Sequence, residues 1–410
     1  MTVPFFDPFV LGSDPFPHFA HMRAAGGIAR GAAPYPEIDE AYYVFSHDLV
    51  SRALKHPDLL QAPPGRYEEV RRKLVDQAPM ALLSRSVLLA DPPQHGGLRR
   101  PVAGYLSRPA VEALSQGMRS LSRDLVDKAL ADGGIEAVAG LAVPVSFWLL
   151  QEILGIEIED PWMLKSITRR MAGAFDLRRE NPAASSAEAY AECQAFVEDR
   201  LTRHAYRPDG MVAGMTREVA EGRWSREDMV ANIVFMLFAG QETVVDAFGN
   251  AVVALDRFPA QRALLDSRAV DWNTAAAELL RYGASVQYAV ARIAAQDIDL
   301  GGVRIASGQA VVPVLGSGNR DDAVFADGDS LDLTRAPAVS MTFGTGLHVC
   351  LGQHVARIEI AAMMEALFTR APDWRLDAAN AERRPSMSFH GMSTAPLIFS
   401  RAAGTVAGSA

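Results

Sequence analysis

The feature that most constrains the fold is a long apolar segment near the middle of the chain, REDMVANIVFMLFAGQETVVDAFGNAVVALDRF, at residues 226–258. It is longer than a typical globular helix and apolar around most of its circumference, which predicts a central helix buried on nearly all sides. Such a helix needs a shell of other elements around it. Segments 108–130 and 186–205 carry apolar residues at helical intervals and predict amphipathic helices of that shell.

Strand patterns are fewer and clustered. AYYVFS at 41–46 predicts one strand, and residues 288–315 predict several short strands broken by Gly-Gly and Ser-Gly turns. After residue 365, DWRLDAA and APLIFS predict further strands. Neither a fixed-period repeat nor a Gly/Ser linker divides the chain. We therefore expect one mainly α domain with small β-sheets over residues 1–410, ending in a frayed tail at about 402–410.

Charge and hydropathy narrow the class of protein. The formal net charge of −9 argues against a general nucleic-acid-binding protein, which needs a basic face. The N-terminal MTVPFFDPFVLGSDPF has no basic region followed by an apolar stretch, so we expect no signal peptide. The apolar stretch 137–150 contains Pro144 and is shorter than the roughly 20 residues that span a bilayer, which favours a buried helix and no membrane association.

The chain has two cysteines, Cys193 and Cys350, with unrelated flanking sequences and no CxxC pair. This spacing disfavours a structural disulfide and a cysteine-rich zinc site. Unpaired cysteines in a chain without an export signal indicate a cytoplasmic protein.

Cys350 lies in the most specific segment, FGTGLHVCLGQHVARIEIA at 343–361. Gly344, Gly346 and Gly352 permit tight turns and the close approach of a planar group. A helical pattern follows, so Cys350 is expected just before a helix, where free N–H groups and the helix dipole stabilise a thiolate. A thiolate with amide donors suits a tuned iron ligand. A buried cysteine in a glycine-rich turn is the simpler alternative for a lone cysteine.

The complete spacing, Phe-Gly-x-Gly-x-His-x-Cys-x-Gly, resembles the haem-binding signature of the cytochromes P450 at every fixed position. The resemblance implies that Cys350 is the axial thiolate of a haem b. It also places Phe343 beside that sulfur and His348 near a haem propionate. The implied fold has the haem between the long central helix and the helix that follows the cysteine loop.

Two more segments match the family in the same order. Glu278 and Arg281 form an ExxR pair on one helix face, which by resemblance has a structural role and pairs with Arg335. The segment ADPPQHGGLRRPV at 90–102 places His95 and Arg99 four residues apart, and the resemblance assigns both, with Arg292, to the haem propionates. Alone, each pattern is more often an ordinary surface pair.

The central segment contains FAGQETVVDAF at 238–248, which resembles the family's oxygen-activating helix. Ala239 and Gly240 are small and leave room for dioxygen. Thr243 is predicted to hydrogen-bond dioxygen, and Glu242 to connect that site to water, since splitting the O–O bond requires protons. A packing defect with a polar pair facing a neighbour is the alternative for this segment alone.

The resemblance implies a monooxygenase that uses dioxygen as co-substrate and oxidises a small hydrophobic compound, by analogy in natural-product biosynthesis. Electrons are expected from a separate ferredoxin and ferredoxin reductase, and Arg99 and Arg100 are candidates for docking an acidic partner. The expected substrate pocket takes residues from several family positions: Phe175, Phe235, Phe238, Val286, Gln287, His390 and Met392.

Three other functions stay open at this point. Peroxide-driven peroxygenases use the same cysteine loop but usually replace the acid–alcohol pair that Glu242 and Thr243 represent here. Oxidative coupling of aromatic rings uses the same machinery without oxygen transfer. A haem-thiolate sensor of gas or redox state is the non-enzymatic alternative, and it needs an output module that the sequence does not suggest.

Overall fold

The computed structural model describes residues 3–8, 11, 14–32, 40–61, 78–175, 182–336 and 338–400. The expected frayed tail at about 402–410 lies outside these residues. The α-helices are α1 (Phe16–Ala24), α2 (His47–Lys55), α4 (Ala78–Leu83), α5 (Gln94–Ala103), α6 (Arg108–Asp132), α7 (Val143–Leu154), α8 (Pro161–Met171), α9 (Pro182–Thr202), α10 (Met211–Ala220), α11 (Arg226–Arg257), α12 (Pro259–Asp266), α13 (Trp272–Gly283), α14 (Leu315–Gly318) and α15 (Gln353–Arg370).

The remaining elements are short. The 3-10 turns are η2 (Gly104–Leu106), η4 (Ala172–Phe175), η5 (Met341–Phe343) and η6 (Gly346–His348), and η3 (Ala137–Ala142) is a π-helix. The strands are β1 (Phe5–Phe6), β2 (Ile28–Ala32), β3 (Glu40–Val44), β4 (Leu59–Leu60), β5 (Gly134–Glu136), β6 (Arg292–Ala294), β7 (Ile298–Leu300), β8 (Val303–Ile305), β9 (Ala310–Pro313), β10 (Arg375–Leu376), β11 (Glu382–Arg383), β12 (Met392–Thr394) and β13 (Pro396–Ile398). This confirms the mainly α fold with small sheets.

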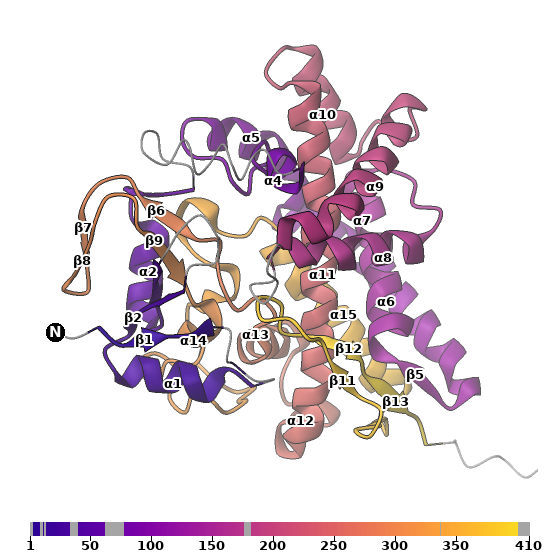
Figure 1. The fold of residues 1–410 in the computed structure, drawn as a ribbon. Coiled ribbons are helices and arrows are strands. Elements are labelled where there is room, and N and C mark those ends of the chain that lie inside the picture. The colour runs from indigo at the N-terminus through magenta and orange to yellow at the C-terminus, as the bar shows by residue number, and fades with distance from the viewer. Residues whose placement is uncertain are drawn as a thin grey trace, which may run out of the picture.

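The central helix is α11, within one residue of the predicted bounds. Its first turn is fixed by a capping box, in which the side chains of Ser225 and Asp228 each accept a hydrogen bond from the other's backbone N–H. At 1.5 Å per residue its 32 residues extend about 48 Å. Figure 1 shows α11 running through the middle of the molecule, and it contacts α7, α8, α9, α13 and α15 among others.

Figure 1 shows β1, β2, β6 and β9 of the largest sheet to the left of α11, whereas β5 and β13 of a second sheet lie to its lower right. The largest sheet has the order β1-β2-β3-β9-β6-β4, in which β1/β2 and β3/β9 pair in parallel and the other neighbours are antiparallel. A second sheet, β10-β13-β5, joins the C-terminal strands to the end of α6. Arg292, which is the first residue of β6, lines the same cavity as Cys350.

Two helical segments are long and apolar enough to cross a membrane by length and composition, Ala137–Leu154 and α11. In the first, η3 and α7 are continuous, so the helical run is 18 residues, longer than the predicted apolar stretch 137–150. The share of each segment that is buried within the protein is 67% and 72%, respectively. Both are therefore core helices of this fold, as the sequence predicts.

Candidate functional site

The cysteine loop connects η5 and η6 to the start of α15. Gly344 and Gly346 have φ values of +62° and +75°, which L-residues with side chains rarely adopt. At Gly346 a Cβ atom would also lie 2.8 Å from the backbone oxygen of Leu54, so α2 and the loop approach closely only because this residue is glycine. The loop is closed by the Cys350 N–H, which donates to the Phe343 carbonyl at 2.9 Å.

Cys350 precedes α15 by three residues, as predicted, and its side chain is unpaired and accessible from an internal cavity. Burial raises the pKa of the Cys350 thiol, while the backbone N–H of Gly352 and the charge of Arg99 act to lower it. Donors are thus in place for a thiolate, and a cation at the sulfur would stabilise it further.

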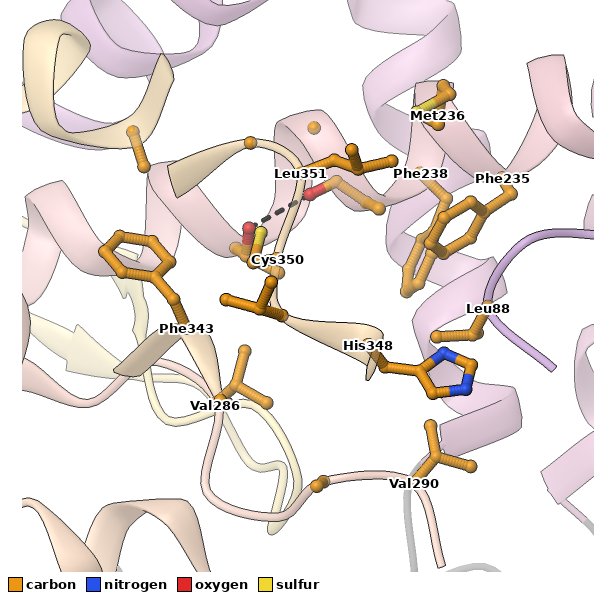
Figure 2. Close-up of a pocket in the computed structure, with 18 of the residues that line it drawn as sticks. Leu88, Phe235, Met236, Phe238, Val286, Val290, Phe343, His348, Cys350 and Leu351 are labelled. Carbon is orange, nitrogen blue, oxygen red and sulfur yellow. Dashed lines mark hydrogen bonds between the residues drawn. The ribbon is translucent and has the colours of Figure 1, made fainter. Parts of the chain in front are cut away.

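The cavity has a volume of about 390 Å³ and lies between the cysteine loop and α11. Figure 2 shows Cys350 and His348 on the loop, and around the same space Leu88, Phe235, Phe238, Val286 and Val290. Most of the lining is apolar, as in small-molecule sites.

One edge of the cavity is cationic. The rings of His95 and His348 lie 4.4 Å apart between centroids, and Arg99 Nη2 donates to the Val349 carbonyl at 2.7 Å. Burial, together with the charge of Arg292, lowers the pKa of His348 to about 3. The pKa of His95 is lowered by burial and by Arg99.

The Nε2 atoms of His95 and His348 are buried and have no hydrogen-bond partner within the described structure. Buried polar atoms of this kind are rare and call for a ligand. This arrangement fits haem, which carries two carboxylates on a flat apolar ring. The imidazoles of His95 and His348 and the guanidiniums of Arg99 and Arg292 would face the carboxylates, and the apolar cavity beside Cys350 would hold the ring. His95 itself is not in the cavity wall; it lies behind His348 and lines a hollow on the other side.

The ExxR pair is buried and forms a three-residue cluster. Arg281 donates to both carboxylate oxygens of Glu278 at 2.7 Å, and Arg335 Nε lies 3.2 Å from the same carboxylate. Arg281 also donates to the carbonyls of Asn319, Gly328 and Ser330. These carbonyls belong to the segment that leads into the cysteine loop, so the cluster anchors that segment on α13.

On α11, Phe235, Ala239 and Thr243 face the cavity, as their spacing predicts. The Thr243 hydroxyl donates to the Ala239 carbonyl at 3.0 Å. Gly240 also borders the cavity, but a Cβ on it would lie 2.7 Å from Leu150 Cδ2, so its missing side chain lets α7 pack against α11.

The structure separates Glu242 from Thr243. Glu242 is fully buried outside the cavity lining, because successive helical residues point about 100° apart. Its carboxylate accepts hydrogen bonds at 2.7 to 3.0 Å from Lys165 Nζ, Thr168 Oγ1 and Arg384 Nη1. Although burial acts to raise it, these neighbouring charges hold the pKa of Glu242 below its usual range. In this conformation the carboxylate is therefore an ion-pair partner, and it makes no contact with the cavity.

Four of the expected substrate-pocket residues line the cavity: Phe175, Phe235, Phe238 and Val286. Gln287, His390 and Met392 do not, which corrects the prediction. The Gln287 amide is turned into the protein and donates to the Ala284 carbonyl. Met392 packs on Gly249 of α11 in the core.

His390 lies near the ring of Phe16 and the guanidinium of Arg383, away from the cavity. Its neighbours Ser388 and Phe389 line the cavity instead. The isolated bridge between Val286 and Phe389 holds Phe389 at the cavity, and the next side chain, His390, points away from it. Sequence position alone identified this segment but not its inward face.

Sequence reasoning also missed Glu359 and Ser146, which both line the cavity. Ser146 Oγ donates to Glu359 Oε1 at 2.7 Å, and burial raises the pKa of Glu359 to about 8. The available signal was a carboxylate on the apolar face of the predicted helix after Cys350.

Comparisons with known proteins agree with this site. A family model described as Cytochrome P450 matches residues 273–384. Nocardicin C N-oxygenase of Nocardia uniformis subsp. tsuyamanensis is 31% identical over 377 residues, covering 92% of both chains. The cytochrome P450 monooxygenase PikC of Streptomyces venezuelae is 30% identical over 399 residues, covering 95% of this chain and 92% of that protein. The crystal structure of CalO2 superposes with a TM-score of 0.86 at 29% identity, over 97% of this chain and all of the other.

Proposed function

The chain belongs to the cytochrome P450 family of oxidoreductases that incorporate molecular oxygen, and from this premise we propose that it is a monooxygenase acting on a small hydrophobic organic compound in natural-product biosynthesis. The observation that carries the proposal is an apolar cavity between Cys350 and Thr243, with a cationic cluster at its edge. We propose further that residues 1–410 form one haem domain.

The proposed cofactor is haem b, held without a covalent link. Cys350 would ligate the iron, Phe343 and Gly352 would support the sulfur, and His348, His95, Arg99 and Arg292 would bind the propionates. When bound, haem supplies the iron at which dioxygen is reduced and split. Gly344 supports this assignment through the turn that presents Cys350, and Ala239, which is small, would leave room for dioxygen on the α11 side of the cavity.

The residues of α11 handle the protons. A threonine hydroxyl donates one hydrogen bond and accepts others, so Thr243 Oγ1 can exchange its bond to the Ala239 carbonyl for one to the oxygen substrate. Glu242 would pass protons only after it leaves Lys165 or Arg384. We therefore assign Thr243 to the contact with oxygen and Glu242 to the delivery of protons from behind α11.

Electrons would come from a separate ferredoxin and ferredoxin reductase. A surface hollow lies beside the cysteine loop, lined by Arg99, Arg100, Gly96, Gly97 and the exposed Leu347 among others. Positive charge around an apolar residue suits an acidic iron–sulfur protein, and charge steers such encounters.

We also propose a cytoplasmic location. Cys193 and Cys350 form no disulfide, which favours a cytoplasmic enzyme.

Turnover under labelled dioxygen tests the proposal. The holoprotein would be reconstituted with a surrogate ferredoxin and reductase and offered a panel of hydrophobic compounds under ¹⁸O₂. A product that carries one ¹⁸O atom and depends on the reductase is expected. A coupled product without label would instead assign oxidative coupling, and label taken only from added H₂¹⁸O₂ would assign a peroxygenase.

A further inference from the structure

We propose that the substrate presents an uncharged aromatic ring to three phenylalanines of the cavity wall, Phe175, Phe238 and Phe389. These three residues are called the phenylalanine cluster. The inference rests on the proposed function and specifies the substrate class of the same site.

The cluster brings together rings from three separate segments, η4, α11 and the chain before β12. Phe175 and Phe238 are stacked, with centroids 5.3 Å apart and planes at 8°. Phe389 meets both rings edge-on, at 6.2 Å and 90° from Phe175 and at 5.9 Å and 86° from Phe238. These are the preferred geometries of aromatic pairs, and all three residues line the cavity. A substrate ring entering the cavity therefore meets both faces and edges of fixed rings.

Polar contacts behind the rings hold the cluster in place. The Ser388 hydroxyl donates to the Phe175 carbonyl and so joins η4 to the C-terminal segment. The guanidinium of Arg384 lies 5.2 Å from the centroid of the Phe389 ring and also binds the buried carboxylates of Glu242 and Asp246. The cluster is thus organised before a ligand binds, which reduces the entropy lost on binding.

The distribution of charge excludes an ionised group beside the cluster. Among the described residues, the cationic members of the lining, Arg99 and Arg292, belong to the edge around His348. Glu359 is held largely uncharged at neutral pH because burial raises its pKa to about 8. The ion pairs of Glu242 and Asp246 lie outside the lining. An ionised substrate group at the cluster would lose its hydration without gaining a counter-charge.

A matched set of three ligands separates ring recognition from simple hydrophobicity. The set is 4-phenylbutan-2-one, 4-cyclohexylbutan-2-one and 4-phenylbutanoate. The saturated ring has more apolar surface, so burial of area alone favours the cyclohexyl ketone. Ring–ring geometry favours the phenyl ketone, and we expect it to bind about three- to tenfold more tightly. Equal or tighter binding of the cyclohexyl ketone, or of 4-phenylbutanoate, overturns the proposal.

Binding is followed by two readouts, the spin-state shift of the holoprotein's Soret band and the ligand-dependent rise of Tm. Phe389→Leu and Phe238→Leu keep apolar volume but remove a ring, so each is expected to abolish the preference while binding of the cyclohexyl ketone changes less than about twofold. Phe258→Leu is the control, because its ring pairs with Tyr282 outside the cavity. A preference that survives both cluster substitutions contradicts the proposal.

The Tm readout does not depend on the iron. If the Soret band shows no thiolate ligation, the proposed function fails, whatever the ligand preference. If thiolate ligation is present and both readouts show no phenyl preference, only the substrate class fails.

Discussion

The two walls of the cavity are built differently. The cysteine-loop wall takes Phe343, Gly344, His348 and Cys350 from one short segment, with a cationic edge supplied by three other positions. The opposite wall is assembled from α11, η4 and the chain before β12, and the ring of Phe389 packs on Arg384, which is paired with buried Glu242 behind it. The first wall carries the residues of the family's haem-binding signature, whereas the second takes its phenylalanines from three separate segments of the chain. Cofactor binding and substrate choice can therefore be altered separately.

The largest effect is expected at the cysteine-loop wall. Cys350→Ala removes the only side chain assigned to the iron, so reductase-dependent turnover should fall to background. Cys193→Ala is the matched control, because Cys193 is buried in the core and does not line the cavity. Turnover that survives Cys350→Ala and is lost in Cys193→Ala would reverse the assignment of the ligand.

Beneath that wall, the Glu278–Arg281–Arg335 cluster should dominate stability. Arg281→Ala leaves the buried Glu278 carboxylate without its main partner, which typically costs about 3–5 kcal/mol in the free energy of unfolding. Arg304→Ala removes an exposed partner of Asp297 and should leave the free energy of unfolding nearly unchanged, because water and salt screen exposed ion pairs. Denaturant unfolding of both variants measures the difference, and similar costs would show that the buried cluster does not anchor the loop.

The opposite wall is expected to control how efficiently electrons are used. Thr243→Ala should lower the product formed per NADPH by about tenfold or more while NADPH oxidation continues, since proton delivery is lost. Thr243→Ser retains the hydroxyl and should restore most of the coupling. Product and NADPH are measured in the same reaction. Unchanged coupling in Thr243→Ala would remove this residue from the proton path.

A smaller effect is expected from pH at His390, outside the cavity. Burial, with Arg383 and Arg320 nearby, lowers the pKa of His390 to about 3, below its ordinary value of 6.5. Below pH 6.5 the unfolded chain binds this proton and the folded protein does not, so the contribution of His390 to stability falls as pH falls from 6.5 toward 3. His390→Gln should reduce the loss of unfolding free energy between pH 7.5 and pH 5.5 by about 1 kcal/mol. Parallel pH curves for the two proteins would contradict this.

The two walls of the cavity also differ in how much of their structure the sequence predicts. The bounds of α11 and the turn before α15 are predictable because helical periodicity and the glycine spacing around Cys350 are local. The inward face of residues 388–390 is not, because the bridge from Val286 to Phe389 sets it from a distant segment.

Long-range partners explain the remaining differences. Glu242 is buried among Lys165 and Arg384, which lie 77 and 142 residues away in sequence. The Ser146–Glu359 pair is separated by 213 residues. Hydrophobic periodicity is a local pattern and does not predict contacts between residues so far apart. The sequence therefore predicted the segments that form the cavity better than the direction in which each side chain points.

The absorption spectrum of the dithionite-reduced, carbon monoxide-bound protein tests the central claim most directly. A Soret band far to the red of that of histidine-ligated haem, present in Cys193→Ala and lost in Cys350→Ala, is the result that the assignment of Cys350 predicts. A band typical of histidine ligation, or a red-shifted band that persists in Cys350→Ala, would contradict it.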